Sequence, residues 1–107
     1  LEWWMERLNE SFQVLRAGFL NDWEQPPGYS ETTPEYEART LARTARRWHQ
    51  IVQEPEWGMD RQMINVEDFA RDLEAALHHE DKPAADRAFS RLSNACMTCH
   101  FWYRDNE

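Results

Sequence analysis

The clearest indication of the fold is residues 82–104, which read K-P-A-A-D-R-A-F-S-R-L-S-N-A-C-M-T-C-H-F-W-Y-R. Small and apolar side chains recur there every three or four positions, which places them on one side of an α-helix. They are Ala85, Ala88, Phe89, Leu92, Ala95, Cys96 and Cys99. Asp81-Lys82-Pro83 predicts a tight turn before this segment. We therefore predict a helix with one apolar side that ends near Arg104.

Three earlier segments show the same helical period. The first runs to about Asn21, the second begins at Thr33-Pro34-Glu35 and stops before Pro55, and the third ends near Glu80. Threonine is a good N-cap and proline suits the first helical position, so the second start is well defined. The third helix begins between Asp60 and Asn65, and Asn65 is the more convincing cap. Loops at 25–30 and 56–60 separate these segments.

Each segment has an apolar stripe that must be buried against the others. The stripes are Leu1, Met5, Leu8, Phe12, Leu15 and Phe19; then Leu41, Ala45, Trp48 and Val52; then Val66, Phe69, Leu73, Ala76 and Leu77. No strand pattern competes with this interpretation. The sequence predicts an all-α fold, an antiparallel four-helix bundle, in a single domain over residues 1–107.

Charge and hydropathy exclude several classes of function. Twenty acidic and twelve basic residues give a net charge of −8, which argues against nucleic acid as a partner because phosphate binding needs a basic surface. No stretch approaches the ~20 apolar residues of a membrane span. Nothing in the sequence indicates catalytic turnover, so we do not expect an enzyme.

Both cysteines of the chain stand in Cys96-Met97-Thr98-Cys99-His100. On a helix the two sulfurs lie one turn apart and face the same way, and the imidazole follows at about 100°. Two thiols can add to the vinyl groups of a porphyrin while the imidazole reaches its iron. This is the attachment pattern C-x-x-C-H of c-type haem, which predicts one covalently bound haem c.

Other uses of the two cysteines stay open. A zinc site needs a fourth ligand, which would have to come from His49, His78 or His79. A thioredoxin-like pair would follow a strand, which this sequence lacks. A disulfide would close so short a loop that it would stabilise the fold little.

The motif and its position resemble the cytochrome c-prime family, the class II c-type cytochromes. Those proteins carry C-x-x-C-H near the end of the fourth helix, commonly followed by a Y-R or F-R pair, and Tyr103 and Arg104 occupy those places here. The resemblance implies one haem near the end of the last helix. It also implies export to the periplasm, with a signal peptide that has been removed. His100 is then the proximal iron ligand, and Arg104 lies near its exposed side.

The same resemblance suggests a residue for the sixth iron position. In the family this residue comes from the first helix and is often followed by apolar residues three, seven and ten positions later. From Met5 those places hold Leu8, Phe12 and Leu15, which makes Met5 the candidate distal ligand. A thioether at this position raises the iron potential. Leu1 stands where the family often has an arginine.

We therefore expect a periplasmic carrier that transfers one electron at a time to redox partner proteins. The alternative is a five-coordinate protein that binds NO or CO at an open distal position. A structural bundle with a disulfide or metal clip is the third interpretation. Arg39, Arg43, Arg46 and Arg47 form a basic face, either solvated or a docking patch for a redox partner. Trp3 and Trp4 could contribute to a homodimer.

Overall fold

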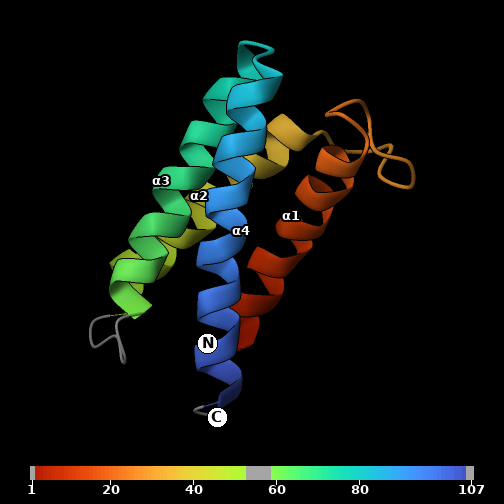
Figure 1. Ribbon diagram of the computed structural model, residues 1–107. Coiled ribbons are helices and arrows are strands. Elements are labelled where there is room, and N and C mark those ends of the chain that lie inside the picture. Colours follow the sequence, from red (N-terminus) through yellow and green to blue (C-terminus); the bar gives the residue numbers. More distant parts are fainter. Residues whose placement is uncertain (1, 53–58, 106–107) are drawn as a thin grey trace.

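The computed structural model describes residues 2–52 and 59–105, with side chains described for 3–52 and 60–98. These ranges contain four helices and no strand (Figure 1). They are α1 (Glu2–Leu20), α2 (Pro34–Ile51), α3 (Met59–His78) and α4 (Lys82–Asp105). The prediction of an all-helical chain with four helices is confirmed.

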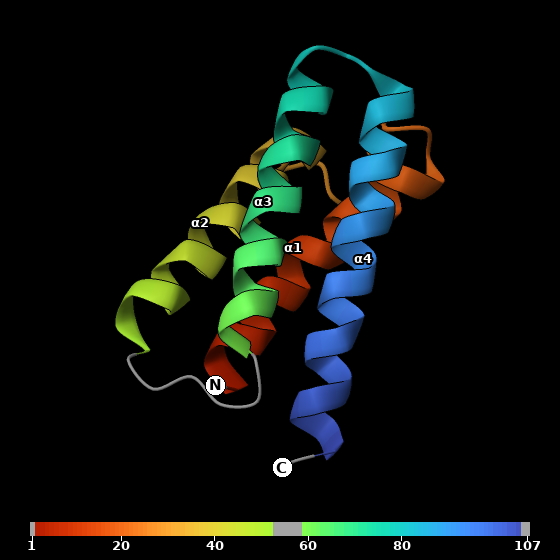
Figure 2. The same cartoon turned by 60° about the vertical axis from the view of Figure 1, so that its left-hand side comes forward.

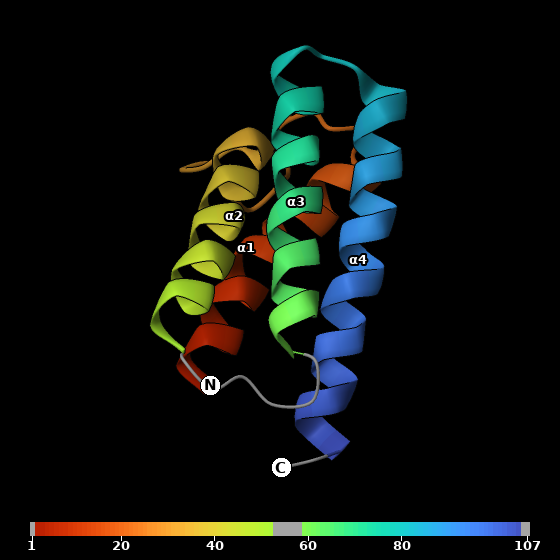
Figure 3. The same cartoon turned by 90° about the vertical axis from the view of Figure 1, so that its left-hand side faces the viewer.

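The helices are arranged around a common core. Helix α2 packs against α1 and α3, and α3 packs against α4, whereas α1 and α4 make by far the fewest contacts of the neighbouring pairs. Figure 2 and Figure 3 show α3 between α2 and α4, with α1 behind them. The N-terminal end of α1 and the C-terminal end of α4 lie at the same end of the molecule, opposite the turn that joins α3 to α4. The arrangement therefore has one loosely packed side, the seam between α1 and α4.

The predicted start of α2 is confirmed in detail. The hydroxyl of Thr33 accepts a hydrogen bond from the backbone N–H of Tyr36 at 3.1 Å, and Pro34 opens the helix. Glu35 and Glu37 lie in the first turn, where a carboxylate is favoured by the helix dipole. Local sequence alone fixes this helix end.

The predicted cap of α3 at Asn65 is wrong, because the helix begins at Met59 and Asn65 lies inside it. Met63 lies three residues before Val66 on the inner side of α3, and its side chain is fully buried. Burying a methionine of this size stabilises the fold by roughly 1.5–3 kcal/mol. This burial extends the helix beyond the point that the capping pattern indicated.

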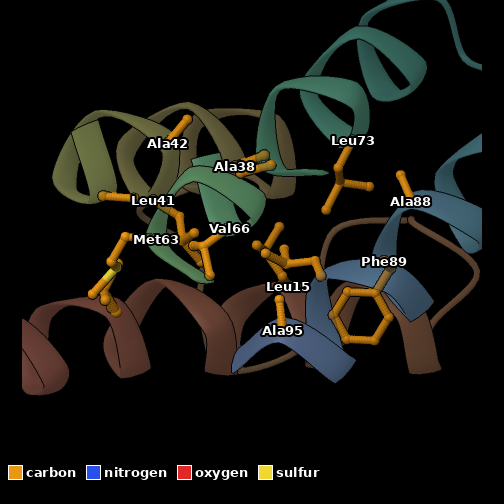
Figure 4. Packing of buried hydrophobic residues seen from close by; sticks show 14 of the residues in the cluster. Leu15, Ala38, Leu41, Ala42, Met63, Val66, Leu73, Ala88, Phe89 and Ala95 are labelled. Atoms are coloured by element: carbon orange, nitrogen blue, oxygen red, sulfur yellow. The ribbon is translucent and has the colours of Figure 1, made fainter. Parts of the chain in front are cut away.

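The core is made from the inner sides of all four helices (Figure 4). Its large fully buried side chains include Leu15 of α1, Leu41 of α2, Leu73 of α3 and Leu92 of α4. Alanines occupy many of the remaining core positions, particularly on α2 and α4, so the helices can approach closely there. No helix in the described ranges combines the length and the apolar character needed to cross a bilayer.

Candidate functional site

An aromatic stack closes one end of the seam between α1 and α4. It consists of Phe12 and Phe19 of α1, Trp23 just after α1, and Phe89 of α4. The ring of Phe89 lies parallel to Phe12 at 5.5 Å and to Phe19 at 4.9 Å between centroids, and it meets Trp23 edge-on at 5.7 Å. Such ring pairs contribute about 0.5–1.5 kcal/mol each beyond their buried area. Among the described side chains of α4, Phe89 thus makes the ring contacts that join this helix to α1.

Polar contacts attach the corner after α1 to the beginning of α4. The indole N–H of Trp23 donates to Asp86 at 2.9 Å, while Lys82 contacts Asp22 at 3.0 Å and Glu24 at 3.2 Å. Hydrogen bonds to these two carboxylates raise the pKa of Lys82. Asp22 and Trp23 both adopt left-handed backbone angles, with φ of 54° and 63°. Left-handed angles are unfavourable for such residues, and the contacts of Trp23 with Asp86 and Phe89 offset that cost.

The opposite end of the seam is where the predicted site residues lie. Met5 is seven residues before Phe12, and Cys96 is seven residues after Phe89. Seven residues are two helical turns, or about 10.5 Å along the axis. Because the start of α1 and the end of α4 lie at the same end of the molecule, both steps lead from the aromatic stack in the same direction. Helix register therefore places Met5 and Cys96 on facing sides of the seam.

Met5 and Cys96 have similar surroundings. Both side chains are half-buried, and both pack against the edge of the hydrophobic core. Trp4 and Phe12 of α1 lie at this edge as well. The described residues at this edge of the core thus bring sulfur and aromatic groups to the seam.

Helix α4 continues without a break through the cysteine motif to Asp105. Cys99 accordingly follows Cys96 by one turn of the same helix, and His100 follows Cys96 by four residues. Arg104 is four residues beyond His100 in the last turn. The side chains of Cys99, His100, Tyr103 and Arg104 lie outside the described residues, so their predicted roles stay predictions.

The remaining histidines are on the surface and have acidic neighbours. His49 is exposed, with Nδ1 2.5 Å from the Asp60 carboxylate, and His78 lies 3.5 Å from Glu35. His78 and His79 stand at the α3–α4 turn, and Cys96 lies fourteen residues after Lys82, which is about 21 Å along α4. Neither can therefore join Cys96 at one metal ion, which weakens the zinc interpretation. Within the residues whose side chains are described, no three histidine, cysteine, aspartate or glutamate residues form a cluster that could hold a metal.

Sequence reasoning missed part of the inner side of α1. Ser11 and Val14 are buried there, whereas of the described stripe residues 5, 8, 12, 15 and 19 only Leu8 and Leu15 are buried. Phe12 is half-buried and Phe19 is 37% exposed because both turn toward α4. The seven-residue spacing of Met5, Phe12 and Phe19 was the available signal for a separate row of side chains along the seam.

Two of the surface clefts that are lined by described residues lie away from this seam. One, of about 540 Å³, runs between α1 and α2, and the other, of about 270 Å³, runs between α3 and α4.

No family model, curated protein or solved structure matches the chain.

Proposed function

We propose that this chain is a mono-haem c-type cytochrome on an antiparallel four-helix bundle, similar to the cytochrome c-prime family, which transfers single electrons in the periplasm. Cys96 and Cys99 would hold haem c through thioether bonds, and His100 would be the proximal iron ligand. A bound haem supplies a one-electron iron couple. The other roles belong to this chain's own residues.

The observation that carries the proposal is the seam between α1 and α4. Helix pairs α1–α2, α2–α3 and α3–α4 are closely packed, but α1 and α4 are in direct contact mainly through the aromatic stack. Beyond the stack, Met5 and Cys96 stand on facing walls among apolar side chains. A flat, apolar macrocycle attached to α4 suits a site between two weakly packed helices better than it suits the closely packed remainder of the core.

The chain's own residues would set the properties of this site. Apolar side chains such as Trp4 and Phe12 exclude water. The thioether of Met5 is the candidate distal ligand, and such a ligand raises the reduction potential. Arg104, four residues after His100, would place a cation in the last turn of α4 near the proximal ligand. A cation at this position also interacts favourably with the negative end of the helix dipole.

One observation favours the second candidate, a binder of NO or CO. Met5 lies in the first turns of α1, below the aromatic stack that secures this helix to α4, and it is only half-buried. If its sulfur does not bind iron, the distal side of the haem stays accessible to a small gas.

Mass spectrometry of the mature polypeptide tests haem attachment directly. We expect the mass of the chain plus one haem, and loss of covalent attachment in a variant with Cys96→Ala and Cys99→Ala. Met97→Ala is a matched control, because Met97 lies between the cysteines but is 51% exposed. A mature chain without added porphyrin would refute the proposal.

The visible spectrum then separates the two functions. A sharp low-spin spectrum that carbon monoxide does not change supports electron transfer through a His100 and Met5 ligand pair. Met5→Ala should convert it into a broad high-spin spectrum that responds to the gas, whereas Met97→Ala should leave it unchanged. A high-spin spectrum in the unaltered protein would support gas binding, and an unchanged spectrum in Met5→Ala would exclude Met5 as a ligand.

A further inference from the structure

Three arginines form a positive surface on the outer side of α2. Arg43, Arg46 and Arg47 are all exposed and lie within an arc of about 100° on the helix. We call them the arginine face. The opposite side of α2 carries the buried residues Leu41, Ala45 and Trp48, so the arginines point away from the core.

The neighbouring Arg39 is already engaged within the molecule. Its Nε donates to Glu74 of α3 at 2.6 Å, and a second nitrogen lies 3.8 Å from Glu35. The hydrogen bond that Arg39 donates to the Glu74 carboxylate raises the pKa of Arg39. For the arginine face, by contrast, no ion pair joins it to the rest of the described chain. Three exposed arginines without an ion pair among the described residues therefore form a local positive patch on a chain whose net charge is −8.

The arginine face continues into the cleft between α1 and α2. Tyr36 and Thr40 line this cleft of about 540 Å³, and Arg43 and Arg47 follow Thr40 by three and seven residues on the same edge of α2. The cleft has Tyr29 on the loop side and Ser11, only 3% exposed, from α1. The remaining lining residues are Arg7, Asn9, Glu10, Gln13, Val14 and Glu37. Because Glu10 and Glu37 are acidic, the attraction for a carboxylate comes from the arginine face and not from the cleft itself.

We propose that this surface is a docking site for an acidic protein, which places a carboxylate-bearing segment along the edge of α2 from Tyr36 to Arg47. Arginine and tyrosine are enriched in protein interfaces and among the residues that dominate binding energy. Tyr36 is 56% exposed, so its ring is available to a partner. Guanidinium groups pair with carboxylates through two parallel hydrogen bonds, which favours an acidic partner over a neutral one.

Charge also determines how the two proteins meet. The net charge of −8 repels an acidic protein as a whole, so the arginine face orients the encounter and accelerates productive association. If the chain is the cytochrome proposed above, the acidic protein is the one with which it exchanges electrons. Docking itself depends only on α1 and α2, and it would persist if the haem assignment failed.

Nuclear magnetic resonance titration of the full chain tests the proposal without reference to haem. The probe is short poly-L-glutamate, added at low ionic strength to isotopically labelled protein. We expect amide shifts to change along α2 from Tyr36 to Arg47 and not along α4, and the affinity to decrease as salt is added.

Two charge-reversed variants provide the matched comparison. The first carries Arg43→Glu, Arg46→Glu and Arg47→Glu. The second carries Arg16→Glu, Arg87→Glu and Arg91→Glu at exposed positions of α1 and α4, which gives it the same net charge. We expect about tenfold or greater loss of affinity in the first and at most a twofold to threefold loss in the second. A third variant carries Arg43→Gln, Arg46→Gln and Arg47→Gln. It should lose affinity as well, and it serves as the test variant if the variant with three glutamates on α2 does not fold.

Several outcomes would overturn the proposal. Equal losses in the two glutamate variants would show that only net charge matters. Duplex DNA or anionic lipid vesicles that bind as tightly as poly-L-glutamate would show a general anion site. Self-association of the unaltered chain that is lost in the first variant would identify a second copy as the occupant.

Discussion

Replacing Phe89 with alanine removes the one α4 side chain that contacts all three other rings of the aromatic stack. Phe89 is 6% exposed, and a phenylalanine buried to this degree costs about 3–5 kcal/mol when it is truncated to alanine. The neighbouring rings of Phe12 and Phe19 are only partly buried and can move into the space that is left, so we expect a loss near the lower end of this range, about 3 kcal/mol. That is a large part of the roughly 5–15 kcal/mol of free energy of unfolding of an ordinary domain. Urea unfolding followed by circular dichroism measures it.

Phe69→Ala provides the control. Phe69 is a half-buried residue of α3 that packs against the core but does not belong to the aromatic stack, so its truncation should cost less. A double-mutant cycle between Phe12 and Phe89 should give a coupling of about 0.5–1.5 kcal/mol. A cost below about 1.5 kcal/mol for Phe89→Ala, or no coupling with Phe12, would refute the role of the stack.

Because Phe89 lies between α1 and α4, its truncation should affect the four helices unequally. Helix α1 should remain attached to α2 through Leu8 and Leu15 but lose its main connection to α4. Amide hydrogen exchange in Phe89→Ala should therefore accelerate more in α1 than in α2 or α3. Uniform acceleration across all four helices would show that the stack does not act on the seam in particular.

Two other substitutions test the corner between α1 and α2. Gly18→Ala would place its new methyl carbon 2.9 Å from a ring carbon of Pro34. We expect this crowding to lower the free energy of unfolding by about 1–3 kcal/mol, which thermal unfolding measures. An unchanged melting temperature would contradict the close packing of Gly18 against Pro34. Lys82→Met removes the contacts to Asp22 and Glu24, which raise the pKa of Lys82 in the folded state. These contacts stabilise the folded state only while the lysine is protonated, so the variant should be less stable than the unaltered chain at about pH 8. As the pH rises above the ordinary lysine pKa of about 10.4, the stabilities of the two proteins should converge. A stability difference that stays constant across this range would rule out the ion pairs as its source.

The helices were predictable because their signals are local. The capping pattern at Thr33 and Pro34 specifies the start of α2 through backbone groups a few residues away. The start of α3 was not predictable in this way, because the burial of Met63 against other helices outweighed the cap at Asn65. Local capping contributes about 1 kcal/mol, whereas burial of a large side chain contributes more.

For the candidate site, the sequence predicts a chemistry but not a position in the fold. The pattern of Cys96, Cys99 and His100 predicts haem attachment from spacing on a single helix. Nothing within that helix shows which other helix would face it. The resemblance to the cytochrome c-prime family selected Met5. The contact of Phe12 with Phe89 shows that this row of α1 turns toward α4.

The sequence by itself determined that the chain is helical, where most of its helices lie, and that two cysteines and a histidine share one helical segment. These properties depend on residues within one or two turns of each other, and the amino-acid pattern records them directly. Only the tertiary structure decided that α1 and α4 meet loosely, that Phe89 joins them, and that Met5 and Cys96 stand across the remaining seam. Those relations connect residues more than seventy positions apart, and they arise from the best packing of all four apolar surfaces at once.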